Sequence, residues 1–144
     1  IHTAKSHATG GFTDIVFIGD SGGNQRGMSA VTDQLNHEWA DTGIRAHFIG
    51  DYYAKSNDDI NAYLRALGFA DAQIGTHAGL IDTSQMLFVN PHHVRMDKAV
   101  LNGGFAGSGV SGDPSLATAA LGEAQLRIKI DNALAQIRAS VGTR

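Results

Sequence analysis

Short apolar runs alternate with amphipathic stretches in the first half of the chain. Residues 14–20 form a continuous apolar run that ends in Gly and Asp, which is typical of a strand buried on both faces in a parallel sheet. Between Gly27 and Gly43, apolar residues recur at three- and four-residue spacing, and this predicts a helix that packs on the sheet. Residues 45–50 then predict a second strand. The helical stripe consists of Met28, Val31, Leu35 and Trp39.

Two further helices are predicted before the chain becomes rich in glycine. The polar cluster at 57–59 predicts a helix start, and Gly68 predicts its end. The order strand, helix, strand, helix favours a doubly wound α/β sheet. Residues 76–90 show helical spacing again, with Pro91 closing the run, so His77 falls at the N-terminus of this predicted helix.

The last third of the chain predicts a loop and one long helix. Residues 102–112 contain so much Gly that they predict a loop whose backbone can approach a ligand closely. Asp113 and Pro114 predict the N-cap and the first residue of the final helix, and apolar spacing supports that helix as far as Val141. We expect residues 1–144 to form a single α/β domain.

Composition narrows the functional classes. Eleven basic and 14 acidic residues give a net charge of −3, which leaves no electrostatic footprint for nucleic acid or an anionic membrane. No apolar run approaches the roughly 20 residues that span a bilayer, and no signal peptide is evident. We therefore expect a soluble protein of the cytoplasm or the periplasm. Because the chain has no cysteine, any metal would be held by His, Asp, Glu or water.

The turn at residues 19–25 lies where the first predicted strand gives way to a helix, and open α/β sheets bind ligands at that edge. Successive glycines let backbone N–H groups converge there, which suits an anion or an oxyanion. A tight turn in which Asp20 or Ser21 caps the helix is the alternative. Tyr52 and Tyr53, which follow the second strand, are expected to line or cover the same pocket rather than to act in chemistry.

Ser21 has a second interpretation. Gly-Asp-Ser after a strand is similar to the nucleophile motif of some serine hydrolases, in which a histidine activates the hydroxyl. The Asp-x-x-His that such hydrolases carry near the C-terminus is missing from the predicted final helix.

A second candidate site lies in residues 77–84, His-Ala-Gly-Leu-Ile-Asp-Thr-Ser. The positive end of a helix favours the neutral form of His77, which suits a general base or a metal ligand. Asp82 lies about one and a half helical turns away, so its reach to the imidazole is left open. The alternative is that His77 caps the helix and Asp82 is solvated. His92 and His93 predict a surface turn rather than a metal site.

Three segments in this order carry a family resemblance: the turn G-D-S-G-G-N-Q, then H-A-G-L-I-D-T-S-Q-M-L at 77–87, then G-V-S-G-D-P-S-L-A-T-A-A-L-G at 109–122. Together, over residues 11–137, they resemble the C-terminal part of the creatininase (creatinine amidohydrolase) family. The resemblance implies a three-layer α/β/α sandwich with a mostly parallel sheet, usually in a homo-oligomer. It also implies a hydrolase of a C–N bond in a cyclic amide or formamide, with one or two divalent metals, Zn or Mn.

The same resemblance implies roles for individual residues. His77 matches the histidine that shuttles protons at the leaving nitrogen, and Asp82 stands where the family usually has Glu. Gly22, Gly23 and Asn24 would line the site for a small-molecule substrate. Water activated by the metal would be the nucleophile.

The chain departs from the family pattern at the metal site. The family turn reads N-G-H-G-G-N, so Ser21 replaces its metal-binding His, and Gly23 stands where some members carry a metal-binding carboxylate. Asp20 is a candidate oxygen ligand in their place. The other family ligands precede the first strand, in a segment that we expect to be missing here or to be supplied by a separate N-terminal chain.

Three hypotheses follow. In the first, the chain is the C-terminal portion of a creatininase-like, metal-dependent hydrolase. In the second, it is a metal-poor relative that serves as a binding or structural subunit. In the third, Ser21 is a nucleophile and His77 its base, which gives a metal-independent esterase or amidase.

Overall fold

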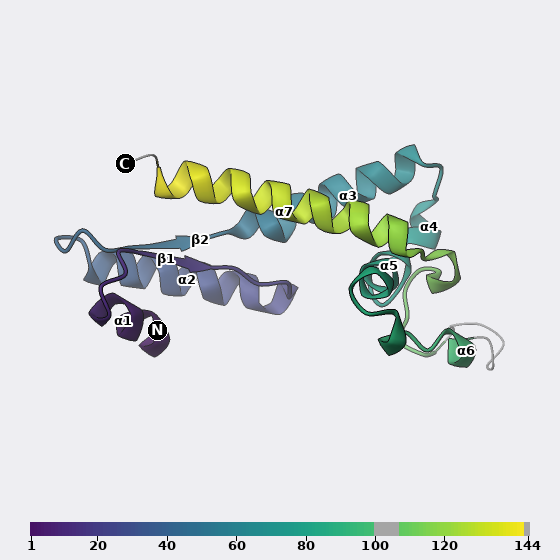
Figure 1. Cartoon of the computed structure of the whole chain (residues 1–144), viewed down its shortest axis with the longest axis horizontal. Helices are drawn as coiled ribbons and strands as arrows, with labels where there is room; N and C mark the ends of the chain where they lie inside the picture. Colours follow the sequence, from purple (N-terminus) through teal and green to yellow (C-terminus); the bar gives the residue numbers. More distant parts are fainter. Residues whose placement is uncertain (100–106, 143–144) are drawn as a thin grey trace. The chain divides into compact units, whose positions relative to one another are not determined.

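The computed structural model describes residues 1–99 and 107–142. These residues form two compact units, shown in Figure 1 with the elements labelled. Unit 1 comprises Ile1–Ser56 with Lys129–Arg144, and unit 2 comprises Asn57–Ile128. The long helix α7 (Ala119–Val141) and the helix α3 (Ala54–Ala66) each contribute residues to both units. That residues 1–144 are one domain stays a prediction.

Unit 1 is built on two parallel strands, β1 (Asp14–Phe17) and β2 (Arg45–Phe48), as the apolar runs predict. Ile15 lies opposite Ala46 in the register, and both are buried. The helix α2 (Gly22–Glu38) packs against this face through Leu35, and Trp39 directly after the helix completes the cluster. The predicted stripe of α2 is thus confirmed in Leu35 and Trp39, which are buried in the core. The short helix α1 (His2–Thr9), which the sequence pattern did not predict, adds Ala4 to it.

The prediction that the first strand is buried on both faces is wrong for the described chain. Val16 is 38% exposed and Ile18, just beyond the strand, is 46% exposed. The strand also ends at Phe17 rather than at residue 20. The reason is that the core of unit 1 lies on the Ile15 side of the strand, and Val16 points to the opposite face and is not part of this core.

The free edge of β2 is capped by a side chain. Asn36 on α2 accepts the backbone N–H of Ala46 at 2.8 Å and donates to the carbonyl oxygen of the same residue at 2.9 Å. The amide side chain therefore stands in for a neighbouring strand at this position. The parallel pair with its helices agrees with the α/β class, and the three-layer sandwich stays a prediction.

Unit 2 is helical in its described part. Its core joins α3, the one-turn helix α4 (Asp71–Ile74), α5 (Leu80–Val89) and the first turns of α7. Between them lie the single turns η2 (Pro91–His93), α6 (Met96–Ala99) and η3 (Pro114–Leu116). In unit 1, η1 (Gly50–Tyr52) follows β2. The buried core side chains are Ile60, Leu64, Ile74 and Leu80.

Several predicted helix starts are wrong. Helix α2 begins at Gly22 and not after Gly27, and helix α3 begins at Ala54 and not at residue 57. The helix predicted from residue 76 begins only at Leu80, because Gly75 (φ 67°) and Ala78 (φ 49°) adopt left-handed backbone conformations that a right-handed helix cannot contain.

The start of the final helix is also later than predicted. Asp113 does act as an N-cap and accepts the N–H of Ser115 at 2.9 Å, but it caps η3, and α7 begins at Ala119. The predicted end of the helix at Val141 is confirmed. Of the loop predicted at 102–112, residues 102–106 lie outside the described residues, and Ser111 forms a bridge to His77.

Candidate functional site

The first candidate site lies in unit 1, where the two parallel strands end. The turn after β1 leads into α2, and the turn after β2 leads through η1 to Tyr53. Because parallel strands end at the same edge of a sheet, these turns meet. A Cβ atom on Gly22 would lie 2.7 Å from the Tyr53 hydroxyl oxygen. The structure thus brings Gly22 and Tyr53 together, whereas their role in substrate binding stays a prediction.

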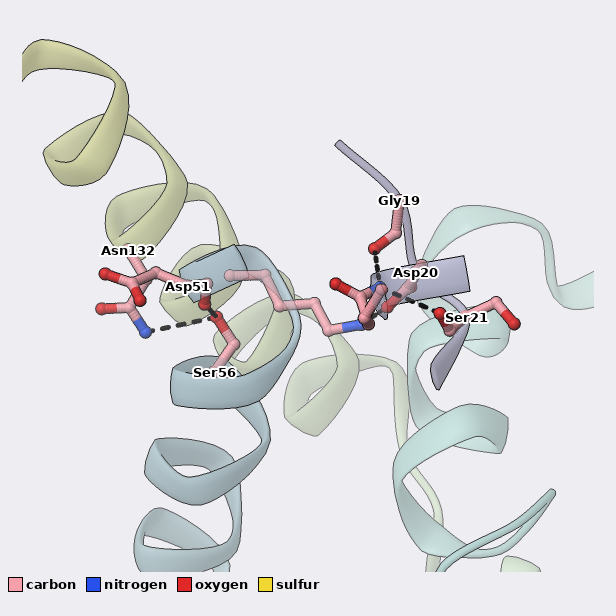
Figure 2. Close-up of polar contacts among 8 residues, drawn as sticks. Gly19, Asp20, Ser21, Asp51, Ser56 and Asn132 are labelled. Atoms are coloured by element: carbon pink, nitrogen blue, oxygen red, sulfur yellow. Dashed lines mark hydrogen bonds and ion pairs between the residues drawn. The ribbon is translucent and has the colours of Figure 1, made fainter. Parts of the chain in front are cut away.

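The backbone of the first turn is held by a side chain that the sequence reasoning did not single out. Gln25 Nε2 donates to the carbonyl oxygens of Gly19 and Ser21, each at 2.9 Å (Figure 2). Ser21 occupies the N-cap position of α2 with an extended backbone, but its side chain makes no capping hydrogen bond. Ser21, Gly23 and Asn24 are exposed.

Asp20, the candidate metal ligand, already has a cationic partner. Lys129 Nζ donates to Asp20 Oδ1 at 2.5 Å, and the ammonium lies 5.2 Å from the centroid of the Tyr52 ring. The Lys129 side chain is 5% exposed, whereas that of Asp20 is 47% exposed. Figure 2 shows Asp20 in the turn between Gly19 and Ser21. The pair therefore consists of a buried cation and a carboxylate that faces solvent.

Burial raises the pKa of Tyr52, and the nearby charge of Asp20 raises it further. Both effects act in the same direction because each disfavours the phenolate. Tyr52 is therefore a neutral phenol at physiological pH, and its ring face is available to the Lys129 ammonium.

A polar stripe on α7 fixes the turn after β2. Gln136 accepts the N–H of Asp51 at 2.8 Å and donates to the carbonyl oxygen of Phe48 at 3.2 Å. Asn132 donates to the buried hydroxyl of Ser56 at 3.2 Å, and that hydroxyl donates to the carbonyl oxygen of Asp51 at 2.8 Å (Figure 2). Lys129, Asn132 and Gln136 recur at three- and four-residue spacing along α7. That spacing is the sequence signal that could have identified Lys129 as a site residue.

The second candidate site, around His77, lies in unit 2. The prediction that His77 begins a helix is wrong, because α5 starts three residues later. Asp82 Oδ2 instead accepts the N–H of Ala78 at 2.6 Å, so the carboxylate stabilises the strained turn before α5. The His77 side chain is exposed and has no hydrogen-bond partner within residues 1–99 and 107–142. Within the described residues, Asp82 forms no hydrogen bond or ion pair with the imidazole of His77.

The two segments with the most specific resemblance contact each other in unit 2. Ser111 donates its backbone N–H to the carbonyl oxygen of His77 at 2.8 Å. A Cβ on Gly75 or Gly79 would lie 1.9 or 2.4 Å from the carbonyl oxygen of Ser111, so these glycines permit the close approach. Ser84 Oγ, which is buried, accepts the N–H of Thr118 at 3.3 Å. Much of the motif sequence therefore serves backbone packing.

A divalent metal does not fit the donor set of the described chain. Within residues 1–99 and 107–142, no three side chains of His, Asp or Glu are gathered closely enough to hold an ion. Asp20 has an ammonium beside it, where a metal would meet repulsion. His92 and His93 form the predicted surface turn, in which the Asn90 side chain accepts the N–H of His92 at 3.2 Å.

Ser21 and His77, proposed as nucleophile and base, belong to different units. Their pairing stays a prediction. Among the described residues, none of the helices combines the length and the apolar character of a membrane-spanning segment.

Comparison with known proteins agrees with the resemblance of the motifs. The family model for creatininase, described as creatinine amidohydrolase, matches residues 1–137. No curated protein and no solved structure matches the chain. The family match extends over nearly all of the 144 residues and includes both candidate sites. The chain therefore belongs to the creatininase family.

Proposed function

We propose that the chain hydrolyses a C–N bond in a cyclic amide or formamide, with His77 moving a proton to the leaving nitrogen. Membership of a family of amidohydrolases is the observation that carries the proposal. The exposed imidazole of His77 supports it, because the ring has no hydrogen-bond partner in the described chain and is open to a substrate that approaches from solvent.

The backbone around His77 suits this role. The bridge to Ser111 fixes the main chain on one side, and the hydrogen bond from Ala78 to Asp82 fixes it on the other. The imidazole is thus mounted on a rigid turn, while Asp82 acts as a positioning residue rather than as its proton partner. Because the described donor set does not hold a divalent metal, no step of this proposal passes through one.

A second function is favoured by the contact between Asp20 and Lys129. A chain whose candidate metal ligand is neutralised internally would serve as a metal-poor binding or structural subunit.

The family's tendency to form oligomers supports a homo-oligomer, or an assembly with a separate N-terminal chain, for either function. The intact mass of the native protein with any co-purifying polypeptide tests this assembly.

The experiment compares wild type, His77→Ala and His93→Ala on a panel of cyclic amides and formamides, with and without added Mn²⁺ or Zn²⁺. His93 is a matched control because it is an exposed histidine of the same unit. We expect His77→Ala to lose at least about 100-fold in kcat while its thermal midpoint is unchanged, because only its backbone contributes to the fold.

Full activity in His77→Ala would remove this histidine from the mechanism. A wild-type chain that hydrolyses no member of the panel, and that retains no stoichiometric metal by elemental analysis, would favour the binding or structural subunit instead.

A further inference from the structure

We propose that Lys129 is the resident cation of the site in unit 1: its ammonium occupies the position beside Asp20 that a divalent metal would take. The site at the carboxyl ends of β1 and β2 is then independent of metal. This inference does not depend on the proposed hydrolysis, because it concerns the charge balance of the folded chain.

The burial of Lys129 is the first step. The Lys129 side chain is 5% exposed, so its ammonium is largely withdrawn from water, and such a charge is retained only where the protein replaces the lost water. The replacement is visible in two groups, the carboxylate of Asp20 at 2.5 Å and the ring face of Tyr52 at 5.2 Å.

Asp20 and Lys129 come from distant parts of the sequence. Asp20 belongs to the turn after β1 and Lys129 to α7, and 109 positions separate them in the sequence. The neighbouring residues Asn132 and Gln136 fasten α7 to the end of β2, to η1 and to the first turn of α3 by three hydrogen bonds. The position of Lys129 beside Asp20 is therefore fixed by a helix that is itself held in place, whereas a flexible surface side chain would not be fixed in this way.

The third step is electrostatic. A divalent ion at Asp20 would stand next to a buried, positively charged amine, and the repulsion between two close cations grows as water is excluded. Within the described residues no second and third ligand are present to offset it. One cation, supplied by the chain itself, satisfies the site.

The test is a double-mutant cycle on the full chain, with Asp20→Asn, Lys129→Met and the double variant. Unfolding equilibria in urea are measured for each protein. We expect Asp20→Asn, which leaves the buried ammonium without its carboxylate, to lower the folding equilibrium constant by at least about tenfold, and the double variant to lose clearly less than the two single losses combined. The exposed pair of Lys5 and Glu38, at 2.5 Å, provides the control cycle through Lys5→Met and Glu38→Gln. Its coupling is expected to be weaker, because solvent screens both charges.

Equilibrium dialysis against Mn²⁺ or Zn²⁺ alone provides the second arm and needs no variant. Wild type is expected to retain no stoichiometric metal, and its thermal midpoint is expected to be the same with EDTA as with either ion. Coupling no stronger than in the control cycle would overturn the proposal. So would about one equivalent of bound metal per wild-type chain, whether or not the variants fold.

Discussion

The backbone of Gly122 on α7 lies directly against the carbonyl oxygen of Ser84 on α5. A Cβ atom at position 122 would be 1.9 Å from that oxygen, well inside any tolerable contact, and the atom it meets is backbone that cannot rotate away. Gly122 thus sets how closely two helices of unit 2 approach each other.

Gly122→Ala is therefore expected to destabilise the protein by about 3 kcal/mol or more, because α5 and α7 must separate. Gly27→Ala is the matched control, since Gly27 is also within a helix and a Cβ atom added there would meet no atom within 4 Å. It should stabilise the chain by about 0.5–1 kcal/mol through the better helix propensity of Ala. Urea denaturation of both variants measures the difference. Equal stabilities would show that α5 and α7 do not approach this closely.

Asn36→Ala is expected to lower the free energy of unfolding by about 1–3 kcal/mol. The substitution removes both partners of the Ala46 backbone, whose N–H and carbonyl group lie in the buried part of the strand pair. Gln34→Ala, on the same helix, removes only an exposed hydrogen bond to Glu38 and should change the stability by less than about 0.5 kcal/mol. A loss that is no larger at position 36 than at position 34 would contradict the capping role of Asn36.

Tyr52→Phe is expected to make the protein less sensitive to alkali. The pKa of Tyr52 is raised by folding above its ordinary value of 10.0, so the unfolded chain loses this proton first. The corresponding stability is present below pH 10.0 and is lost as the pH rises through the folded pKa. Phe keeps a ring face for Lys129 but cannot ionise. Urea midpoints between about pH 9 and pH 11 should fall more steeply for wild type than for Tyr52→Phe. Parallel curves would mean that folding does not perturb this phenol.

A fluorophosphonate probe tests the serine-hydrolase hypothesis. We expect no labelling above that of Ser21→Ala, because the exposed hydroxyl of Ser21 has no hydrogen bond to a base in the described part of the chain. Labelling by mass spectrometry that disappears in Ser21→Ala, and also in His77→Ala, would instead establish the nucleophile and its base.

The local sequence pattern was sufficient to predict most of the strands and helices of unit 1. The runs at β1 and β2 and the stripe that buries Leu35 follow from side-chain periodicity, which depends only on residues close in sequence. The N-cap at Asp113 is equally local. Helix starts were less predictable, because glycines such as Gly22 can enter a helix or stop one, and Gly75 shows the second behaviour.

The motif residues themselves were visible in the sequence, and they sufficed to indicate the family. Their individual surroundings were not. Asp82 contacts the backbone before α5 instead of the His77 ring, and Lys129 reaches Asp20 from 109 positions away. Such contacts depend on how whole helices pack, and neither spacing nor residue type encodes that packing locally. The sequence by itself determined the α/β character, the family and the candidate residues. Only the tertiary structure decided which charges meet, because the packing of α7 buries the Lys129 ammonium, and a buried ammonium needs a carboxylate beside it.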